Sequence, residues 1–205
     1  RKQICNELPM AFGSMPNDGG NLLLSTAEKQ ALIAAEPLAA QYIRPFFGSE
    51  EFLNSKERWC LWFHGISETR LHHDLKQMPQ TAQRIESVRQ KRSESDRVTT
   101  KELAAMPHLF GEIRQPENGN YLLIPSTSSE NRAFIPIGYV DSSAINSNAN
   151  FMLPNATPYH FGILSSTMHN AFMRTVAGRL KSDYRYSNTI VYNNFPFPFA
   201  PPSEE

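Results

Sequence analysis

The chain has 205 residues, which is long enough for one large domain or two small ones with a proper core. It carries 20 basic and 20 acidic residues, and this net charge of zero argues mildly against nucleic-acid binding, because DNA-binding domains usually have a basic excess. No apolar run approaches the roughly 20 residues of a membrane span, so we expect no membrane association. The cysteines, Cys5 and Cys60, favour a reducing cytoplasm, and a first residue other than Met suggests a piece of a longer polypeptide.

The first third of the chain predicts a loop and then a capped helix. Residues 9–20 hold two Pro and three Gly and are expected to form a turn-rich loop, followed by a short strand at 21–24. Ser25 and Glu28 have the spacing of a capping box, which predicts a helix to about residue 35.

A second short helix and a buried strand are expected next. Pro37 is well placed to open the helix, which must end before Pro45. Residues 58–63, RWCLWF, have large apolar side chains in an unbroken row and predict a strand buried on both faces. Its two Trp residues are interpreted as core.

Residues 67–95 are polar and predict a helix interrupted at Pro79. Between residues 81 and 101 six basic residues face three acidic ones, a local excess of three. Such a run is typical of a solvated helix face, but it could also lie along a phosphate backbone. Thr99 and Glu102 then indicate the N-cap of another short helix, which Pro107 closes.

His72, His73 and Asp74 raise the question of a metal or hydrolytic site. Adjacent residues on a helix point about 100° apart, so the two His side chains cannot chelate one ion as an i, i+4 pair would. No Cys-x-x-Cys or second His pair completes the set, and we predict no metal. A hydrolase that uses these residues is the weakest of the functional hypotheses.

Residues 121–124 and 133–137 are two short apolar runs that predict a pair of buried strands. If Asn131 starts the second strand, Glu130 and Arg132 point to the same side. A carboxylate beside a guanidinium suits a C·G base pair, with Glu accepting from cytosine N4 and Arg donating to guanine O6 and N7. The alternative is a surface hairpin in which the two charges merely neutralise each other.

The last third predicts a linker, a long helix and an extended tail. Residues 146–157 are rich in Asn and are interpreted as a linker. Thr157 caps a helix whose apolar side chains recur every four residues to a stop at Gly178, and that stripe is expected to be core. Its members are Leu164, Met168, Phe172 and Val176. A second basic excess surrounds the end of this helix, and the Pro-rich tail 195–202 is expected to pack as a strap.

Several long stretches together resemble one family. In chain order they are GSMPNDGGNLLLS (13–25), YIRPFFGSEEF (42–52), RWCLWF (58–63), LFGEIRQP (109–116), IPSTSSENRAFIPIG (124–138) and FGILSSTMHNAFMRTVAGRLKSDYRYSNTIVYNNFPFP (161–198). They resemble the C-terminal, target-recognition part of MmeI-type single-chain restriction–modification enzymes and their adenine-specific DNA methyltransferase relatives. The similarity covers nearly all of residues 9–199.

The resemblance implies an α+β fold with two parts. Residues 1–140 would be a DNA target-recognition domain, a small mixed β-sheet with flanking helices, and residues 141–205 a helical C-terminal region packed on it. In that family a Glu and an Arg in a Ser-Ser-Glu-x-Arg setting read one base pair, which favours readout by Glu130 and Arg132. Further base contacts would come from about 92–100. The predicted DNA-backbone contacts are Arg84, Arg89, Lys91, Arg92, Arg114, Lys181 and Arg185.

The family also implies a larger parent. Such a protein would bind double-stranded DNA and S-adenosylmethionine, and would methylate the exocyclic amine of an adenine flipped out of the stack. The family's Asn-Pro-Pro-aromatic motif, a glycine-rich cofactor loop and a nuclease pattern are absent here, and residues 193–196 (NNFP) lack adjacent prolines. We therefore expect no catalytic residue, cofactor or activity in this chain, and the parent's methyltransferase domain as a partner.

A scaffold domain that binds a protein partner or the parent's catalytic domain is the alternative. The zero net charge and the aromatic-rich tail favour it slightly. Salt dependence discriminates the two functions, because DNA binding must weaken steeply as salt rises.

Overall fold

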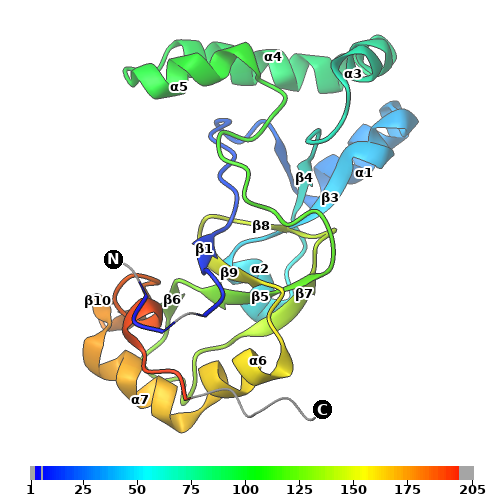
Figure 1. Ribbon diagram of the computed structural model, residues 1–205. Coiled ribbons are helices and arrows are strands. Elements are labelled where there is room, and N and C mark those ends of the chain that lie inside the picture. Colours follow the sequence, from blue (N-terminus) through cyan, green and yellow to red (C-terminus); the bar gives the residue numbers. More distant parts are fainter. Residues whose placement is uncertain (1–2, 6, 199–205) are drawn as a thin grey trace. The chain divides into compact units, whose positions relative to one another are not determined.

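The computed structural model describes residues 3–5 and 7–198, and the chain packs into two compact units (Figure 1). Unit 1 comprises Arg1–Gly13, Gln115–Ser142 and Asn148–Glu205, and unit 2 comprises Ser14–Arg114 and Ser143–Ser147. Both combine helices with small sheets, so the α+β class is confirmed. The assignment of DNA recognition to residues 1–140 and of a helical region packed on it to residues 141–205 stays a prediction. Packing divides the chain differently, because 115–142 belong with 148–205.

Unit 1 is built on a four-stranded antiparallel sheet in the order β1-β9-β5-β7. Its strands are β1 (Ala11–Phe12), β9 (Asn150–Pro154), β5 (Asn120–Pro125) and β7 (Gly138–Asp141). Residues 121–125 of β5 are all buried, as their apolar sequence predicts. Leu122 pairs with Leu153 and lies in the core cluster that includes Leu164 and Met173 of the C-terminal helices. These helices therefore cover one face of the sheet (Figure 1).

The prediction of a linker at 146–157 is wrong. Residues 150–154 form β9, which lies between β1 and β5. Phe151, Met152 and Leu153 are at most 1% exposed, and Asn150 is fully buried. Asn residues on both sides gave this segment a loop-like composition, although its three consecutive apolar residues are sufficient for a strand buried on both faces.

The single helix predicted between Thr157 and Gly178 is wrong, because this segment forms two helices, α6 (Pro158–Ser165) and α7 (Thr167–Val176). Ser166 between them is extended, with ψ of 154°, and its side chain accepts from the His169 N–H to cap α7. The break turns Met168 out of the predicted apolar stripe, and this side chain is 73% exposed. Leu164 of the same stripe is buried as predicted.

A second antiparallel sheet in unit 1 joins distant segments. It has the order β10-β11-β6, with β10 (Gly178–Leu180) and β11 (Asp183–Arg185) in a hairpin and β6 (Thr127–Ser128) beside β11. After the hairpin, the 3₁₀ helix η3 (Tyr192–Asn194) leads to buried Phe195. Residues 199–202 of the predicted strap lie outside the described residues.

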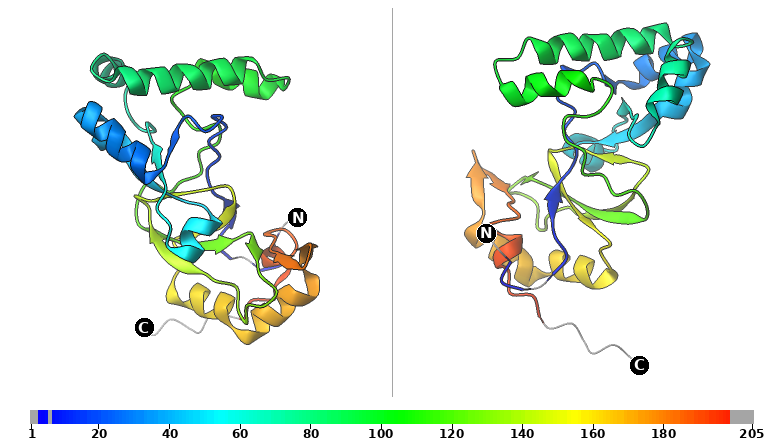
Figure 2. Two further views of the ribbon diagram at one scale, coloured as in Figure 1. Left: turned by 180° about the vertical axis from the view of Figure 1, so that it is seen from behind. Right: turned by 45° about the horizontal axis from the view of Figure 1, so that its top comes forward.

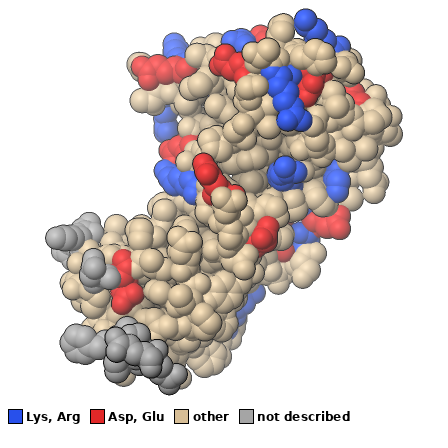
Figure 3. All heavy atoms as spheres, turned by 45° about the vertical axis from the view of Figure 1, so that its right-hand side comes forward, with Lys and Arg blue, Asp and Glu red and all other residues tan. Residues whose placement is uncertain are grey.

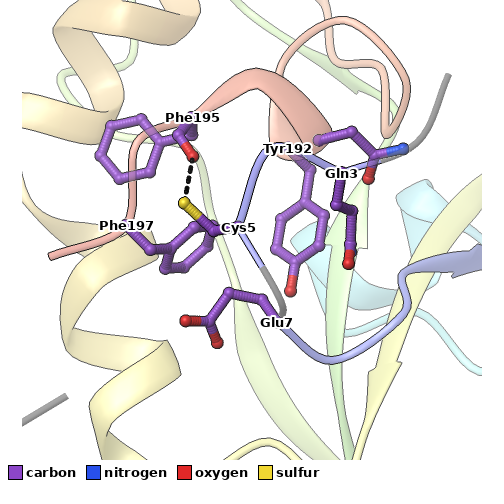
Figure 4. Close-up of a pocket in the computed structure, with 7 residues that line it drawn as sticks. Gln3, Cys5, Glu7, Tyr192, Phe195 and Phe197 are labelled. Atoms are coloured by element: carbon purple, nitrogen blue, oxygen red, sulfur yellow. Dashed lines mark hydrogen bonds between the residues drawn. The ribbon is translucent and has the colours of Figure 1, made fainter. Parts of the chain in front are cut away.

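The N-terminal segment packs against this tail. Figure 4 shows Cys5 directed at Phe195, where the thiol donates to the main-chain carbonyl with a sulfur–oxygen distance of 3.9 Å. The hydroxyl of Tyr192 donates to the carbonyl of Leu8 at 2.7 Å. Both cysteines of the chain are free thiols.

Unit 2 contains a sheet in the order β2-β4-β3-β8. Its strands are β2 (Leu23–Leu24), β4 (Trp59–Leu61), β3 (Ile43–Phe47) and β8 (Ile145–Asn146), and only the β3–β8 pair is parallel. Cys60 and Leu61 are fully buried, which confirms the central strand predicted from RWCLWF. Helix α1 (Thr26–Ala35) begins with the predicted capping box. It is followed by the 3₁₀ helix η1 (Pro37–Tyr42), and the short helix α2 (Ser49–Asn54) was not predicted.

The polar segment forms helices α3 (Glu68–Leu75) and α4 (Pro79–Ser93), interrupted as predicted. Buried Glu36 caps α4 from outside, since its carboxylate accepts the N–H groups of Gln80 and Thr81 and the Thr81 hydroxyl. Helix α5 (Val98–Glu102) and the 3₁₀ helix η2 (Leu103–Ala105) run back beside α4 (Figure 2). The N-cap prediction at Thr99 is wrong, because the N-cap of α5 is Arg97, two residues earlier.

Arg92 of α4 is the largest fully buried side chain described, at 1% exposed. Its five N–H donors meet five main-chain carbonyls at 2.8–3.0 Å, one acceptor per donor. The acceptors are Pro16, Asn17, Leu103, Met106 and Leu109. Burial lowers the pKa of Arg92, and the nearby charge of Asp18 opposes that shift. Through these hydrogen bonds the guanidinium connects the loop after β1 to the segment after α5.

The contact between the loop after β1 and the segment after α5 also requires glycine at position 111. Gly111 donates to the Pro16 carbonyl at 3.0 Å, and a Cβ at this position would lie 2.8 Å from the Cβ of Asn17. Only glycine allows that close approach.

Within residues 3–5 and 7–198, no helix has both the length and the apolar character needed to cross a membrane.

Replacing Arg92 with Met should lower the free energy of unfolding of unit 2 by at least about 4 kcal/mol, because buried carbonyls would lose their donors. Lys91→Met, at the exposed neighbouring position, is the matched control and should change it by less than about 0.5 kcal/mol. Urea unfolding followed by the fluorescence of Trp59 and Trp62 measures both. Equal stability of the two variants would contradict the structural role of Arg92.

Candidate nucleic-acid interface

The segment between β6 and β7, residues 129–137, is here named the recognition loop. The second strand predicted at 133–137 is wrong, since strand structure resumes only at Gly138. Glu130 and Arg132 instead flank Asn131 in a tight turn, in which the Arg132 N–H donates to the Ser129 carbonyl at 3.2 Å. Glu130 is exposed and Arg132 half-buried. The two residues therefore lie in a turn and not in a strand, so strand alternation does not set the directions of their side chains.

Helix α7 holds the backbone of the recognition loop at two points. Arg174 donates from Nη2 to the carbonyls of Arg132 and Ala133, at 2.7 and 2.8 Å. Asn170 accepts the N–H of Ile135 at 2.8 Å, and the Ile135 side chain is 5% exposed within the core. Asn170 and Arg174 are four residues apart, so they lie on one face of the helix. The i, i+4 spacing of these two polar residues is the sequence signal that could have indicated this support of the loop.

Glu130 pairs with Arg179 of β10, not with Arg132. The Arg179 Nη1 lies 3.7 Å from the Glu130 Oε2, and both side chains are nearly half exposed. An exposed pair at this distance contributes little to the stability of the fold. Among the described residues, the Arg132 guanidinium has no hydrogen bond or ion pair. The mutual neutralisation that the alternative reading required is therefore absent from this part of the chain.

Two further basic residues, Lys181 and Arg185, are exposed on the β10–β11 hairpin. Lys181 lies in the turn with φ of 56°, and Arg185 pairs with Thr127 of β6, directly before the recognition loop. Both predicted backbone contacts of unit 1 thus lie on the small sheet that carries the loop.

The predicted backbone contacts of unit 2 are largely engaged within the fold. Arg84 pairs with Glu28 at 2.9 Å, Arg89 with Glu86 at 3.1 Å and Arg114 with Glu112, whereas Lys91 is exposed. On the face shown in Figure 3, basic and acidic side chains are interspersed and form no broad basic patch. Arg92 has no donor left for a phosphate, because all five are used inside the unit, and we remove it from the proposed DNA contacts.

The His72–His73–Asp74 segment has a structural role. Asp74 accepts the Tyr42 hydroxyl at 2.5 Å, a contact that, with His73 and Arg70, holds the pKa of Asp74 below its usual range. In the described part of the chain, no three His, Cys, Asp or Glu side chains are grouped to hold a metal ion. Asp74 thus anchors α3 to η1, whereas His72 and His73 are exposed.

Comparison with known proteins places this geometry in a family. The model of the MmeI target recognition domain matches residues 1–199. The chain belongs to this family. It is 39% identical to DNA methyltransferase A of Bacillus subtilis (strain 168) over 199 residues, which cover 97% of this chain and 22% of that protein. The solved structure of the type IIL restriction–modification enzyme MmeI in complex with DNA is 45% identical, with a TM-score of 0.91 over 100% of this chain and 26% of the MmeI chain.

The MmeI resemblance inferred from the sequence motifs is thus confirmed. The chain spans only about a quarter of the length of these relatives. The recognition loop lies within the matched residues, as do unit 2 and all of unit 1 up to residue 199.

A buried histidine supports α7 beside the recognition loop. His169 is 1% exposed, its Nδ1 lies 3.0 Å from the Leu164 carbonyl, and its Nε2 lies 3.2 Å from the Tyr186 hydroxyl. Burial lowers the pKa of His169 to about 4, although the hydrogen bond to Leu164 opposes the shift. The folded protein therefore disfavours the charged form.

The stability of unit 1 should consequently fall as the pH drops from about 6.5 to about 4. In that window the unfolded chain binds the His169 proton more readily, and this residue alone accounts for on the order of 3 kcal/mol across it. His169→Gln should flatten the slope by up to about 1.4 kcal/mol per pH unit. The control is His72→Gln on the exposed face of α3, which should leave the slope unchanged. Urea unfolding at several pH values measures both, and equal slopes would contradict the assignment.

Proposed function

We propose that this chain is the DNA sequence-reading part of a longer polypeptide, and that Glu130 and Arg132 read one base pair in the major groove. One observation carries the proposal. The Glu130 carboxylate and the unengaged Arg132 guanidinium, two residues apart, extend from one turn. Arg174 and Asn170 fix the backbone of the loop that contains this turn. The family description as a target recognition domain and the DNA complex of MmeI support it.

The two side chains divide the base pair between them. Glu130 has two acceptor oxygens for the exocyclic amine of cytosine, and Arg132 has the forked donors that match guanine O6 and N7. A good bidentate contact of this kind discriminates against the wrong base by roughly 1–3 kcal/mol. Further base contacts from about residues 92–100 remain a proposal, without Arg92.

The phosphate contacts would come chiefly from exposed basic residues. Lys181 and Arg185 flank the recognition loop and Lys91 is exposed on unit 2, so each could meet a phosphate without breaking a described contact. Arg84, Arg89 and Arg114 would have to exchange an intramolecular carboxylate for a phosphate. Their contributions to affinity should be smaller.

The whole polypeptide is proposed to bind S-adenosylmethionine and to methylate adenine in the cytoplasm, with its methyltransferase domain as the partner of this chain. The described residues do not fit the catalytic role. Asn194 donates to the carbonyls of Thr189 and Ile190, and Phe195 packs against His169. Asn194 and Phe195 are thus engaged within the fold, and we assign the cofactor and the catalytic residues to the rest of the polypeptide.

Exchanging the reading pair should change the recognised sequence. In the polypeptide that carries this chain, Glu130→Lys with Arg132→Asp should alter the preferred base pair at one position of the target, because the donor and acceptor sides are reversed. Affinity for non-specific DNA should barely change. Selection from a randomised duplex library measures the preference, and adenine-methylation mapping of cellular DNA gives an independent reading.

The matched control is the exchange Glu50→Lys with Lys56→Glu, which reverses an exposed ion pair of unit 2 and keeps the same charge. It should leave the preferred sequence unchanged. Equal loss of affinity for every duplex after exchange of the reading pair would instead identify Glu130 and Arg132 as phosphate contacts or supports of the fold.

Neutralising Lys181 or Arg185 with Gln should weaken binding to all sequences alike. Each variant should reduce the slope of log affinity against log salt by about 0.9, the value for one phosphate contact on duplex DNA. Fluorescence anisotropy over a salt series measures the slope. Binding by the unmodified polypeptide that is insensitive to salt would favour the scaffold function over DNA recognition.

A further inference from the structure

Tyr184 of β11 lies between two arginines that both reach the recognition loop. The ring is buried, at 9% exposed for the residue, and its centroid is 5.7 Å from the guanidinium carbon of Arg174 and 3.7 Å from that of Arg179. Arg174 comes from the last turn of α7 and Arg179 from β10. Cation–π contact with one ring restricts where both guanidinium groups can lie.

Arg174 holds the backbone at and after Arg132, the residue proposed to read guanine. Its Nη2 donates to two consecutive carbonyls, those of Arg132 and Ala133. The first carbonyl belongs to the peptide plane attached to the Cα of Arg132, so holding it fixes the direction in which the Arg132 side chain leaves the loop. Asn170, one turn earlier on α7, holds Ile135 and keeps the loop from sliding past this contact.

Arg179 faces the carboxylate of Glu130, the residue proposed to read cytosine. The same Nη1 that faces the Glu130 carboxylate at 3.7 Å donates to the Ser182 carbonyl in the hairpin turn at 2.6 Å. With Tyr184 below it, this guanidinium is fixed from two sides and presents a positive charge at a set position. One oxygen of Glu130 faces that charge, and a carboxylate still has acceptor capacity for a base amine.

We propose that Arg174 and Arg179 are positioning residues for base readout, with Arg174 orienting Arg132 and Arg179 orienting Glu130. The proposal rests on the proposed function and extends it, since neither arginine has to touch a base. It also predicts a limit on altered specificity. Glu130→Lys places a cation opposite Arg179, so exchange of the reading pair should be fully effective only when Arg179 is neutralised as well.

The test compares discrimination with affinity. In the polypeptide that carries this chain, Arg174→Met and Arg179→Gln should each reduce discrimination at the Glu130–Arg132 base pair by about tenfold, the equivalent of losing one good contact. Discrimination at the other base pairs of the target should be unchanged. Fluorescence anisotropy with the preferred duplex and with single-pair substitutions measures these ratios, and Lys181→Gln provides the comparison for a phosphate contact.

Double variants separate positioning from general support of the fold. In a Glu130→Gln background Arg179→Gln should cause no further loss of discrimination, and in an Arg132→Gln background Arg174→Met should cause none. Arg174→Lys, which keeps a cation and N–H donors at the site, should recover part of the loss. Neutralising Arg179 should strengthen the new preference of the exchanged Glu130→Lys, Arg132→Asp pair.

Three results would overturn the inference. The first is equal weakening on all duplexes with a smaller salt slope, as for Lys181→Gln, which would make the arginines phosphate contacts. The second is discrimination lost at every position together with a lower melting temperature, and the third is discrimination left intact. If Glu130→Gln and Arg132→Gln leave the discrimination of the unmodified polypeptide unaltered, the proposed readout itself fails and this inference with it.

Discussion

Loops that leave a sheet and remain partly buried must find donors for their carbonyl groups, and both units meet this constraint with an arginine. A guanidinium carries up to five N–H donors in one plane and can satisfy several carbonyls at once. In unit 2 Arg92 uses all five on two loop segments, and in unit 1 Arg174 uses one nitrogen on the recognition loop. These hydrogen bonds hold the backbone of irregular segments in both units, including the recognition loop.

This use of arginine explains why net charge is a poor guide to the function of this chain. A formal charge of zero counts Arg92 as a basic residue, although it is buried and unable to meet a phosphate. It also counts arginines that are paired with carboxylates inside their own unit, such as Arg84 and Arg89. In the proposed function the phosphate contacts come from a small set of exposed cations, which the net charge of the whole chain does not reveal.

The recognition loop depends on residues far away in the sequence. Its strands, β6 and β7, belong to residues 115–142, but its backbone is held by α7 and its carboxylate by β10. If the loop reads a base pair as proposed, readout would require the C-terminal segment of unit 1 as much as the loop itself. The predicted division at residue 140 runs between the recognition loop and the α7 and β10 residues that contact it.

The sequence by itself determined the features whose causes lie within a few residues. The capping box at Ser25, the break before Pro79 and the buried strands of 121–125 and 59–61 follow from local patterns, and the motifs identified the family. Only the tertiary structure decided that the Asn-rich segment is an inner strand, that Arg92 is buried and that Glu130 faces Arg179. Each of these depends on which distant segments meet, and neither spacing nor composition carries that information.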